Sequence, residues 1–157
     1  MLTGIGYDVH RLEKGEELVL GGVQIDYEFG LLGHSDADVL LHALADAILG
    51  AMGAGDIGRH FPDDDPQYKG ISSLILLKEV YELLTEKELK LNNLDAVIIA
   101  QEPKLASYIE SMEEKIAKVL ELSLDRVNVK ATTTERLGFV GRGDGIAAQA
   151  VVSLEEV

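Results

Sequence analysis

The sequence predicts an α/β sandwich, in which helices pack on one face of a mixed β-sheet. The prediction depends on the order of strand-like and helix-like hydrophobic patterns, ββ-α-α-β-α-β-β, which no internal repeat or low-complexity tract interrupts. It also depends on length, because 157 residues suit one domain, and we expect residues 1–157 to form a single domain. Such a chain buries roughly 70% of its unfolded surface, enough to hold a core without disulfides.

The first strands are expected close to the amino terminus. Strand-like sequence begins by Thr3, and around Asp8 three apolar residues alternate with the positions between them: Ile5, Tyr7 and Val9. A hairpin is expected at 18–25, because Gly21 and Gly22 separate two β-favouring runs and can adopt positive φ.

The spacing of apolar residues predicts two helices in the next part of the chain. The first is expected from an N-cap at Ser35 or Asp36 to about residue 52, with six residues facing inward: Val39, Leu40, Ala43, Leu44, Ala47 and Ile48. A loop is expected at 58–70. The second helix is expected at about 72–89, with four residues on its inner face: Leu74, Leu77, Tyr81 and Leu84.

The remaining elements are three strands and one helix. A buried, nearly all-apolar strand is expected at 94–100 and a β-branched strand at 127–134. The helix between them, at about 105–122, is expected to turn five residues inward: Ile109, Met112, Ile116, Val119 and Leu120. A glycine-rich loop then leads to the last strand, at about 146–154.

The formal net charge of −14 at pH 7 narrows the classes of partner. No cluster of lysine and arginine opposes it, so a nucleic-acid partner is not expected. No apolar run approaches the about 18 residues of a membrane span, so no membrane partner is expected. The absence of cysteine and of a visible signal peptide fits a cytoplasmic chain. A small anionic substrate would need metal ions, helix N-termini or placed cations around it.

Asp8, His10 and His42 form the most informative group of polar residues. Asp8 and His10 are two apart in a predicted strand and therefore project from one face, while His42 lies near the start of the first predicted helix. Two imidazoles and a carboxylate can hold zinc on three sides and leave a fourth position for water or substrate. Non-haem iron oxygenases use the same ligand types, although usually with a histidine first in sequence. Manganese and cobalt also accept such ligands, so the residues alone leave the metal open.

Three further segments each allow a structural and a functional interpretation. Residues 34–38 cap the first helix, and their N–H groups could also receive a phosphate, with His34 as a nearby donor. Residues 55–65 form either a solvated acidic loop or a surface that accepts hydrogen bonds from a diol-bearing substrate. Residues 130–136 end a strand with three threonines, and Glu135 offers a hard oxygen ligand suited to magnesium. The tripeptide at 142–144 matches an integrin-adhesion motif but is too short to support that function.

Together these segments resemble one family, the 2-C-methyl-D-erythritol 2,4-cyclodiphosphate synthases of the non-mevalonate isoprenoid pathway. The resemblance covers essentially the whole chain. Its motifs are Gly6-Tyr-Asp-Val-His10, His34-Ser-Asp-Ala-Asp-Val-Leu-Leu-His-Ala-Leu-Ala-Asp46, Gly55-Asp-Ile-Gly58, Phe61-Pro-Asp63, the segment Ala100 to Lys104, Lys130-Ala-Thr-Thr-Thr-Glu135 and Leu137-Gly-Phe-Val-Gly-Arg-Gly-Asp-Gly145. Ala37 stands where the family often has glycine, and we expect helix geometry to tolerate it.

The resemblance implies that 4-diphosphocytidyl-2-C-methyl-D-erythritol 2-phosphate is cyclised, its 2-phosphate attacking the β-phosphorus and expelling CMP. It implies Zn²⁺, or another divalent transition metal, on Asp8, His10 and His42, and Mg²⁺ or Mn²⁺ at a site that includes Glu135. It implies that His34 and Thr133 stabilise the pentavalent transition state. The substrate-binding residues that it implies are Ser35, Asp56, Ile57, Gly58, Phe61, Asp63, Ala100, Pro103, Lys104, Leu105, Ala106, Thr132, Phe139 and Arg142.

The resemblance also implies a homotrimer with each active site shared between neighbouring subunits. It further implies an apolar cavity on the threefold axis, with Phe139 and Arg142 near its end, where an isoprenoid diphosphate would sit. Two other functions are compatible with the residues: a non-haem iron enzyme with the same ligands, and a non-catalytic module that binds a metal or a nucleotide.

Overall fold

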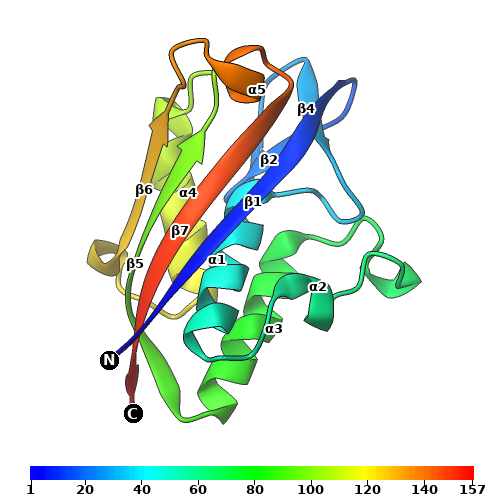
Figure 1. Ribbon diagram of the computed structural model, residues 1–157. Helices are drawn as coiled ribbons and strands as arrows, with labels where there is room; N and C mark the ends of the chain where they lie inside the picture. Colours follow the sequence, from blue (N-terminus) through cyan, green and yellow to red (C-terminus); the bar gives the residue numbers. More distant parts are fainter.

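The computed structural model describes residues 1–157 and contains a five-stranded sheet in the order β4-β1-β7-β5-β6 (Figure 1). Its β5–β6 pair is parallel and the other neighbouring pairs are antiparallel, so the sheet is mixed as predicted. A separate hairpin pairs β2 with β3. The strand bounds are β1 Leu2–Lys14, β2 Leu18–Leu20, β3 Val23–Ile25, β4 Phe29–Leu32, β5 Leu89–Ile99, β6 Val127–Thr132 and β7 Gly145–Glu156.

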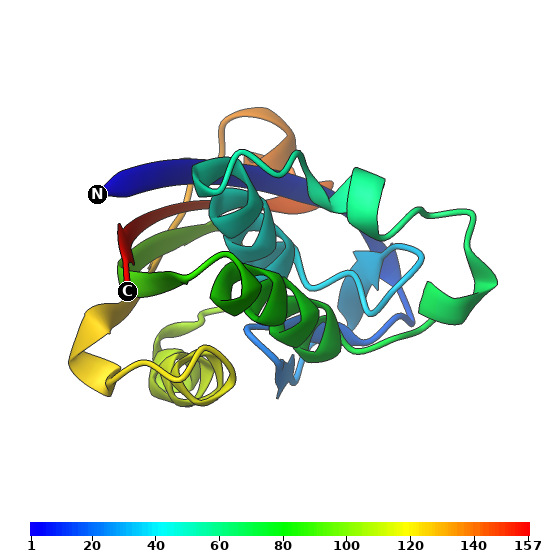
Figure 2. The ribbon, with the colours of Figure 1, turned by 90° about the horizontal axis from the view of Figure 1, so that it is seen from below.

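The three long helices lie on one side of the sheet, which confirms the predicted sandwich (Figure 2). They are α1 (Val39–Ala51), α3 (Ser73–Glu86) and α4 (Ile109–Val119). Two single-turn helices, α2 (Ile57–His60) and α5 (Gly138–Gly141), occupy segments expected to be loops. None of the helices combines the length and the apolar character needed to cross a membrane.

Helix α1 is the centre of the core. It lies between the sheet and α3 (Figure 2), and all of its residues except Asp46 and Gly50 are buried. The six residues predicted to face inward are buried, but so are Leu41, Ala45 and Leu49 on the opposite side. The sequence predicted only one buried face of α1. The helix is also buried on the side that faces away from the sheet, because α3 covers that side.

Two glycines allow α1 to lie unusually close to β1. Gly4 and Gly6 alternate with exposed residues of the strand, and both face the helix. A Cβ added at Gly6 would lie 1.9 Å from the carbonyl oxygen of Ala43, and one added at Gly4 would lie 2.0 Å from that of Ala47. Both neighbours are backbone atoms of α1 and cannot move aside like a side chain. The close packing therefore requires glycine at both positions.

The start of α1 differs from the expectation. Its N-cap is Asp38, whose Oδ1 accepts a hydrogen bond from the Leu41 N–H at 3.1 Å, so the predicted cap at Ser35 or Asp36 was wrong. The Asp38 carboxylate is fully buried and also accepts the N–H groups of Gly21 and Gly22 in the β2–β3 turn, at 3.0 and 2.7 Å. The helix N-terminus is thus covered by the hairpin and is not open to a phosphate. Burial, only partly offset by these N–H groups, raises the pKa of Asp38 to about 6.

Ala37 lies outside the helix. Its φ is +57°, in the left-handed region, so the expectation that helix geometry accommodates this residue was wrong. Glycine is favoured at such a position because it has no Cβ to clash with the following carbonyl. The Ala37 side chain is fully buried beside Gly33, so its methyl group adds packing at a strained position.

Other differences concern the bounds of elements. The second long helix ends at Glu86 instead of about 89, and β5 begins at Leu89, five residues earlier than expected. Glu88, between them, has a φ of +56° and turns the chain sharply from helix to strand. The edge strand β4 was not predicted, because four residues that include a glycine give too short a pattern to recognise. The strand predicted at 127–134 ends at Thr132, and a 3₁₀ turn precedes α4.

The other side of the sheet is open. No long helix covers it (Figure 2), and it exposes apolar side chains of β1 and β7: Ile5, Tyr7, Val9 and Val151. Ile5 is 63% exposed and Tyr7 53% exposed; the alternation around Asp8 predicted that they face away from Asp8 and His10 but not that solvent reaches them. We call this surface the open face. Contiguous exposed apolar side chains on a sheet are typical of a surface that binds another protein.

Replacing Gly6 with alanine tests the close packing of β1 on α1. We expect Gly6→Ala to lower the free energy of unfolding by about 3 kcal/mol, because the new methyl group meets helix backbone. Gly50→Ala is the matched control, since a Cβ at this helical position has nothing nearer than 3.8 Å. It should stabilise the protein by up to about 1 kcal/mol through helix propensity. Urea unfolding measures both, and equal effects would contradict the packing argument.

Candidate metal centre and pocket

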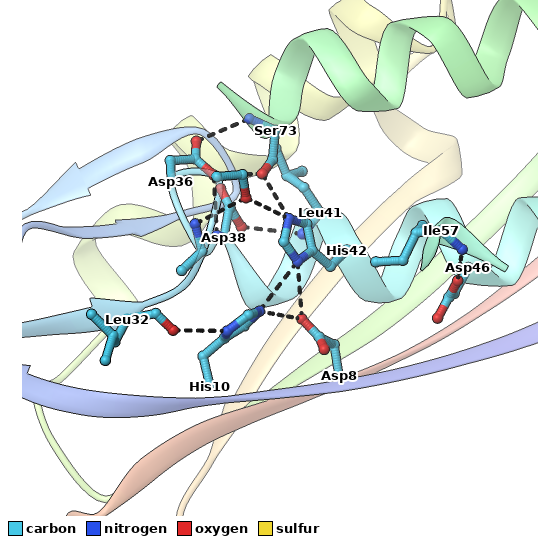
Figure 3. A network of polar contacts seen from close by, with 12 residues as sticks. Asp8, His10, Leu32, Asp36, Asp38, Leu41, His42, Asp46, Ile57 and Ser73 are labelled. Atoms are coloured by element: carbon cyan, nitrogen blue, oxygen red, sulfur yellow. Dashed lines mark hydrogen bonds and ion pairs between the residues drawn. The ribbon is translucent and has the colours of Figure 1, made fainter. Parts of the chain in front are cut away.

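Three metal-ligand atoms converge beside the close contact between β1 and α1 (Figure 3). Asp8 and His10 project from β1 toward the helices, and His42 projects from the first turn of α1. Asp8 Oδ2 lies 2.9 Å from His10 Nε2 and 3.1 Å from His42 Nδ1, and the two nitrogens are 3.2 Å apart. The structure therefore brings together the three residues that the sequence singled out as metal ligands.

Hydrogen bonds on the far side of each imidazole determine which nitrogen faces the centre. His10 Nδ1 donates to the carbonyl of Leu32 on β4, at 3.1 Å, which leaves Nε2 with its lone pair. His42 Nε2 lies 2.9 Å from Ser73 Oγ and 3.1 Å from Ser35 Oγ. With Nε2 protonated, His42 Nδ1 is also unprotonated. Three lone pairs then point at one another, an arrangement that a metal ion between them would stabilise.

The donor set fits a divalent metal ion. Ligand atoms in a tetrahedral zinc site are about 3.3 Å apart, and the three separations here are close to that value. Three protein ligands leave a fourth position, which is the arrangement of catalytic rather than structural zinc sites. Asp8, His10 and His42 would hold the ion. Nitrogen and oxygen donors of this kind do not by themselves distinguish zinc from neighbouring transition metals.

The pKa values of Asp8 and His10 shift in opposite directions. Burial acts to raise the pKa of Asp8, but the hydrogen bonds and charges of His10 and His42 outweigh it and lower the pKa to about 2. Burial acts to lower the pKa of His10, but Asp8 outweighs it and the pKa is raised. Asp8 is therefore ionised at neutral pH and ready to bind a cation, whereas a proton on His10 would compete with metal for the site.

A pocket of 330 Å³ opens beside the three ligand atoms. It contains most of the predicted site residues from the first half of the chain: Asp8, His10, His34, Ser35, His42, Ile57, Gly58, Phe61 and Asp63. Its wall also includes residues that were not predicted: Gly33, Leu41, Ala45, Tyr68 and Leu76. Asp56 does not line the pocket, because its side chain caps α2 by accepting the Arg59 N–H at 3.0 Å.

The loop that forms the far wall of the pocket is held at both ends. At its start, Asp46 Oδ1 accepts the N–H of Ile57 at 2.8 Å (Figure 3). At its end, the Gly70 N–H donates to the carbonyl of His34 at 2.7 Å. Between these points, His34 Nε2 donates to the carbonyl of Asp65 at 2.9 Å. The wall is thus part of the fold, and the imidazole of His34 is oriented by it.

The remaining predicted residues gather at a second place, at the ends of β5 and β6. The N–H of Ala100 donates to the carbonyl of Thr132 at 2.9 Å, and Gln101 Oε1 accepts the Arg136 N–H at 2.9 Å. Thr133 Oγ1 accepts the N–H of Glu135 at 3.2 Å. Pro103, Lys104, Ala106 and Glu135 belong to the same two segments and are at least partly exposed, whereas the side chain of Leu105 is buried in the core. We call these segments, 100–106 and 132–135, the second half-site.

The second half-site lies apart from the metal centre within one chain. None of its residues lines the pocket. β6 is three strands away from β1 in the sheet, a separation of roughly 14 Å at the usual strand spacing. Phe139 and Arg142 lie in and just after α5, and Arg142 Nε donates to Asp144 at 3.0 Å. A single chain therefore does not bring all the predicted site residues together.

Sequence reasoning missed the residues that orient the ligands. Asp46, Ser73 and the carbonyl of Leu32 all bind site residues that are distant in sequence. Asp36 was interpreted only as a helix cap, yet it binds both the backbone and the hydroxyl of Ser73. These partners are 11 to 37 residues apart along the chain, so no local pattern predicts them.

Removing one imidazole tests the metal centre directly. We expect His42→Ala to weaken zinc binding by more than about 100-fold, since even residues behind the ligands change metal affinity by about 10–100-fold. His60→Ala is the control, because His60 donates to the Ala54 carbonyl at 2.8 Å and does not line the pocket. Competition with a chromophoric chelator measures both affinities. Equal affinity of His42→Ala and the unmodified protein would contradict the assignment.

Comparisons with known proteins agree with this geometry. A family model described as the YgbB family matches residues 1–155. The chain is 64% identical over 156 residues to the 2-C-methyl-D-erythritol 2,4-cyclodiphosphate synthase of Desulforamulus reducens, covering 99% of each chain. It is 65% identical over 154 residues to the enzyme of the same name from Alkaliphilus metalliredigens, covering 98% of this chain and 97% of the relative.

Solved structures show the same fold. A CDP-bound 2C-methyl-D-erythritol-2,4-cyclodiphosphate synthase superimposes with a TM-score of 0.90 at 37% identity, covering 98% of this chain and 99% of that one. The bifunctional IspDF of Campylobacter jejuni gives 0.96 at 47% identity, and the match covers 99% of this chain but 42% of that longer one. The matched length, the shared fold and the high identity lead to one conclusion: the chain belongs to the YgbB family.

Proposed function

We propose that this chain is a 2-C-methyl-D-erythritol 2,4-cyclodiphosphate synthase. It would convert 4-diphosphocytidyl-2-C-methyl-D-erythritol 2-phosphate into the cyclic diphosphate and CMP. The observation that carries the proposal is the convergence of Asp8, His10 and His42 at a 330 Å³ pocket, in a chain 64% identical to an enzyme of that name. CDP bound to a relative of the same fold supports a cytidine diphosphate substrate.

The reaction needs charge neutralisation and alignment more than it needs a protein nucleophile. The 2-phosphate oxygen forms a bond to the β-phosphorus, and the bond from that phosphorus to the α-phosphate oxygen breaks, so CMP leaves with its electron pair. A divalent ion at Asp8, His10 and His42 would supply Lewis-acid stabilisation to a phosphate oxygen. Cations bound in the site would also explain how a chain with a net charge of −14 can bind an anionic substrate.

The residues of the pocket receive distinct roles in this proposal. His34, held by its hydrogen bond to the carbonyl of Asp65, would place its imidazole near the transferring phosphoryl group. Ser35, Ile57, Gly58, Phe61 and Asp63 line the pocket and would hold the erythritol part. Asp56 caps α2 in this structure, so its contact with a substrate hydroxyl would have to share the carboxylate with the Arg59 N–H.

The second half-site would bind the other end of the substrate. Residues 100–106 and Thr132 would hold the cytidine and the α-phosphate, with Leu105 contributing only its backbone because its side chain is buried. Thr133 would assist His34 at the transition state, and Glu135 would belong to a second site for Mg²⁺ or Mn²⁺. We propose a homotrimer in which the metal centre of one subunit faces the second half-site of its neighbour.

Two observations support this assembly. The predicted site residues lie in two groups, one on β1 and α1 and the other at the ends of β5 and β6, two and three strands away from β1 in the sheet. The open face presents Ile5, Tyr7, Val9 and Val151 without a covering layer, as an interface between subunits would require. In the same assembly an isoprenoid diphosphate would bind near Phe139 and Arg142. A melting-temperature increase with geranyl diphosphate, lost in Arg142→Ala, would support that ligand, and no increase would count against it.

Two alternatives predict different results. A non-haem iron enzyme with the same ligands would depend on oxygen and carry iron after purification, whereas the name of the 64% identical relative, a cyclodiphosphate synthase, describes a cyclisation that consumes no oxygen. A binding module would retain CDP without releasing CMP from the full substrate.

The cytoplasmic location stays a prediction.

The decisive experiment incubates the metal-loaded protein with 4-diphosphocytidyl-2-C-methyl-D-erythritol 2-phosphate and magnesium. Phosphorus NMR should show a cyclic diphosphate and an equimolar amount of CMP. Intact substrate in the presence of bound zinc would contradict the proposed activity and leave the binding module.

Mixing two inactive variants tests the shared active site. His42→Ala should abolish turnover through the metal centre and Thr133→Val through the second half-site. If the two halves belong to neighbouring subunits, co-expressed variants that assemble at random restore about a quarter of the sites. Two copies of the same variant provide the control. Absence of recovery in verified mixed trimers would contradict the sharing of active sites.

A further inference from the structure

We propose that Asp36 and Ser73 are positioning residues that hold His42 in the tautomer required for metal binding. The inference rests on the metal site of the proposed function and extends it to two residues that do not touch the ion. Its basis is a chain of hydrogen bonds from the Asp36 carboxylate through the Ser73 hydroxyl to His42 Nε2 (Figure 3).

Which group donates in each of these hydrogen bonds follows from the single hydrogen of the Ser73 hydroxyl. The hydroxyl of Ser73 has one hydrogen, and it donates that hydrogen to Asp36 Oδ1 in a short bond. Ser73 Oγ can then offer only a lone pair to His42 Nε2, which lies 2.9 Å away. His42 Nε2 must therefore carry the ring hydrogen. Nδ1 is left unprotonated, and it is the nitrogen that faces Asp8 and His10.

Both carboxylate oxygens of Asp36 accept hydrogen bonds from neighbouring groups. Its Oδ2 accepts the backbone N–H of Ser73 at 3.0 Å, and its Oδ1 also accepts the N–H of Asp38 at 3.1 Å. Its own N–H donates to the carbonyl of Ile71 at 3.1 Å, which fixes the residue beside α3. Three donors converge on this carboxylate. Because the carboxylate accepts the Ser73 hydrogen, the hydroxyl donates to Asp36 and is turned away from His42.

Ser35 does not determine the tautomer in the same way. Its Oγ lies 3.1 Å from His42 Nε2 and accepts the Ala37 N–H at 3.2 Å. No carboxylate receives its hydrogen, so this hydroxyl can rotate and either donate to Nε2 or accept from it. The protonation of His42 Nε2 is thus specified by Ser73 and Asp36.

Other groups already cap α3 and join it to Asp36, so the Ser73 hydroxyl is not needed for either contact. The N-cap of α3 is Ser72, whose Oγ accepts the N–H of Leu74 at 3.3 Å. The backbone N–H of Ser73 joins α3 to Asp36 without the hydroxyl. Ser73 is 1% exposed, so burial of a hydroxyl at this position needs partners, and its partners are Asp36 and the metal ligand.

The test compares two adjacent serines. We expect Ser73→Ala to weaken zinc binding by about 10–100-fold, the usual effect of losing a group behind a metal-bound histidine. Ser72→Ala should lower the urea midpoint of unfolding but leave zinc affinity within about threefold, because its hydroxyl caps α3 and does not contact His42. Chelator competition gives the affinities. Asp36→Asn is the second variant if Ser73→Ala does not fold, and it should also weaken zinc binding.

Nitrogen NMR of the metal-free protein provides a readout that a structural role would not change. The His42 imidazole, assigned with His42→Ala, should show a protonated Nε2 in the unmodified protein and in Ser72→Ala. The Nδ1-protonated tautomer should appear in Ser73→Ala. Unchanged zinc affinity and tautomer in folded Ser73→Ala would overturn the inference. Failure of the unmodified protein to bind zinc would instead reject the metal site on which it rests.

Discussion

The contact between strand β1 and helix α1 is the constraint on which the rest of the structure depends. Gly6 lies two residues before Asp8, and the backbone atom it approaches belongs to Ala43, the residue after His42. The same close packing that closes the core therefore sets how far His42 lies from Asp8 and His10. Residues further along both elements, Gly4 and Ala47, maintain this spacing. The position of the metal centre is thus a consequence of backbone packing, and its donors need little adjustment when an ion binds.

Two carboxylates at the start of α1, the buried Asp38 and the partly buried Asp36, connect this packing to the electrostatics of the site. Asp38 joins the start of α1 to the β2–β3 turn, and Asp36 joins the preceding segment to α3. Each accepts several backbone N–H groups, which compensates for the loss of water around a negative charge. Some of the acidic side chains of this protein therefore serve to hold elements of the fold together. Asp8, in contrast, directs one oxygen at two imidazoles and presents its charge to the metal centre.

Local patterns predicted what depends on local geometry. The alternation in β1 placed Asp8 and His10 on one face, and helical spacing found six of the buried residues of α1. Patterns failed where tertiary contacts decide the outcome: the cap of α1 is Asp38 because the distant hairpin supplies two further donors to it. The contact between Ser73 and His42, 31 residues apart, has no local signature at all. The motifs of a known family supplied the substrate and its binding residues, which hydrophobic periodicity cannot indicate.

The anchored wall of the pocket has a consequence for the thermodynamics of ligand binding. Its loop is restrained at Ile57 by Asp46, at Asp65 by His34, and at Gly70 by the His34 carbonyl. The conformational entropy of this segment is therefore lost when the chain folds, and little remains to be lost when a ligand enters. Binding to such a wall resembles docking to a rigid surface. Its heat-capacity change reflects the apolar area that the ligand covers and contains no contribution from ordering of the loop.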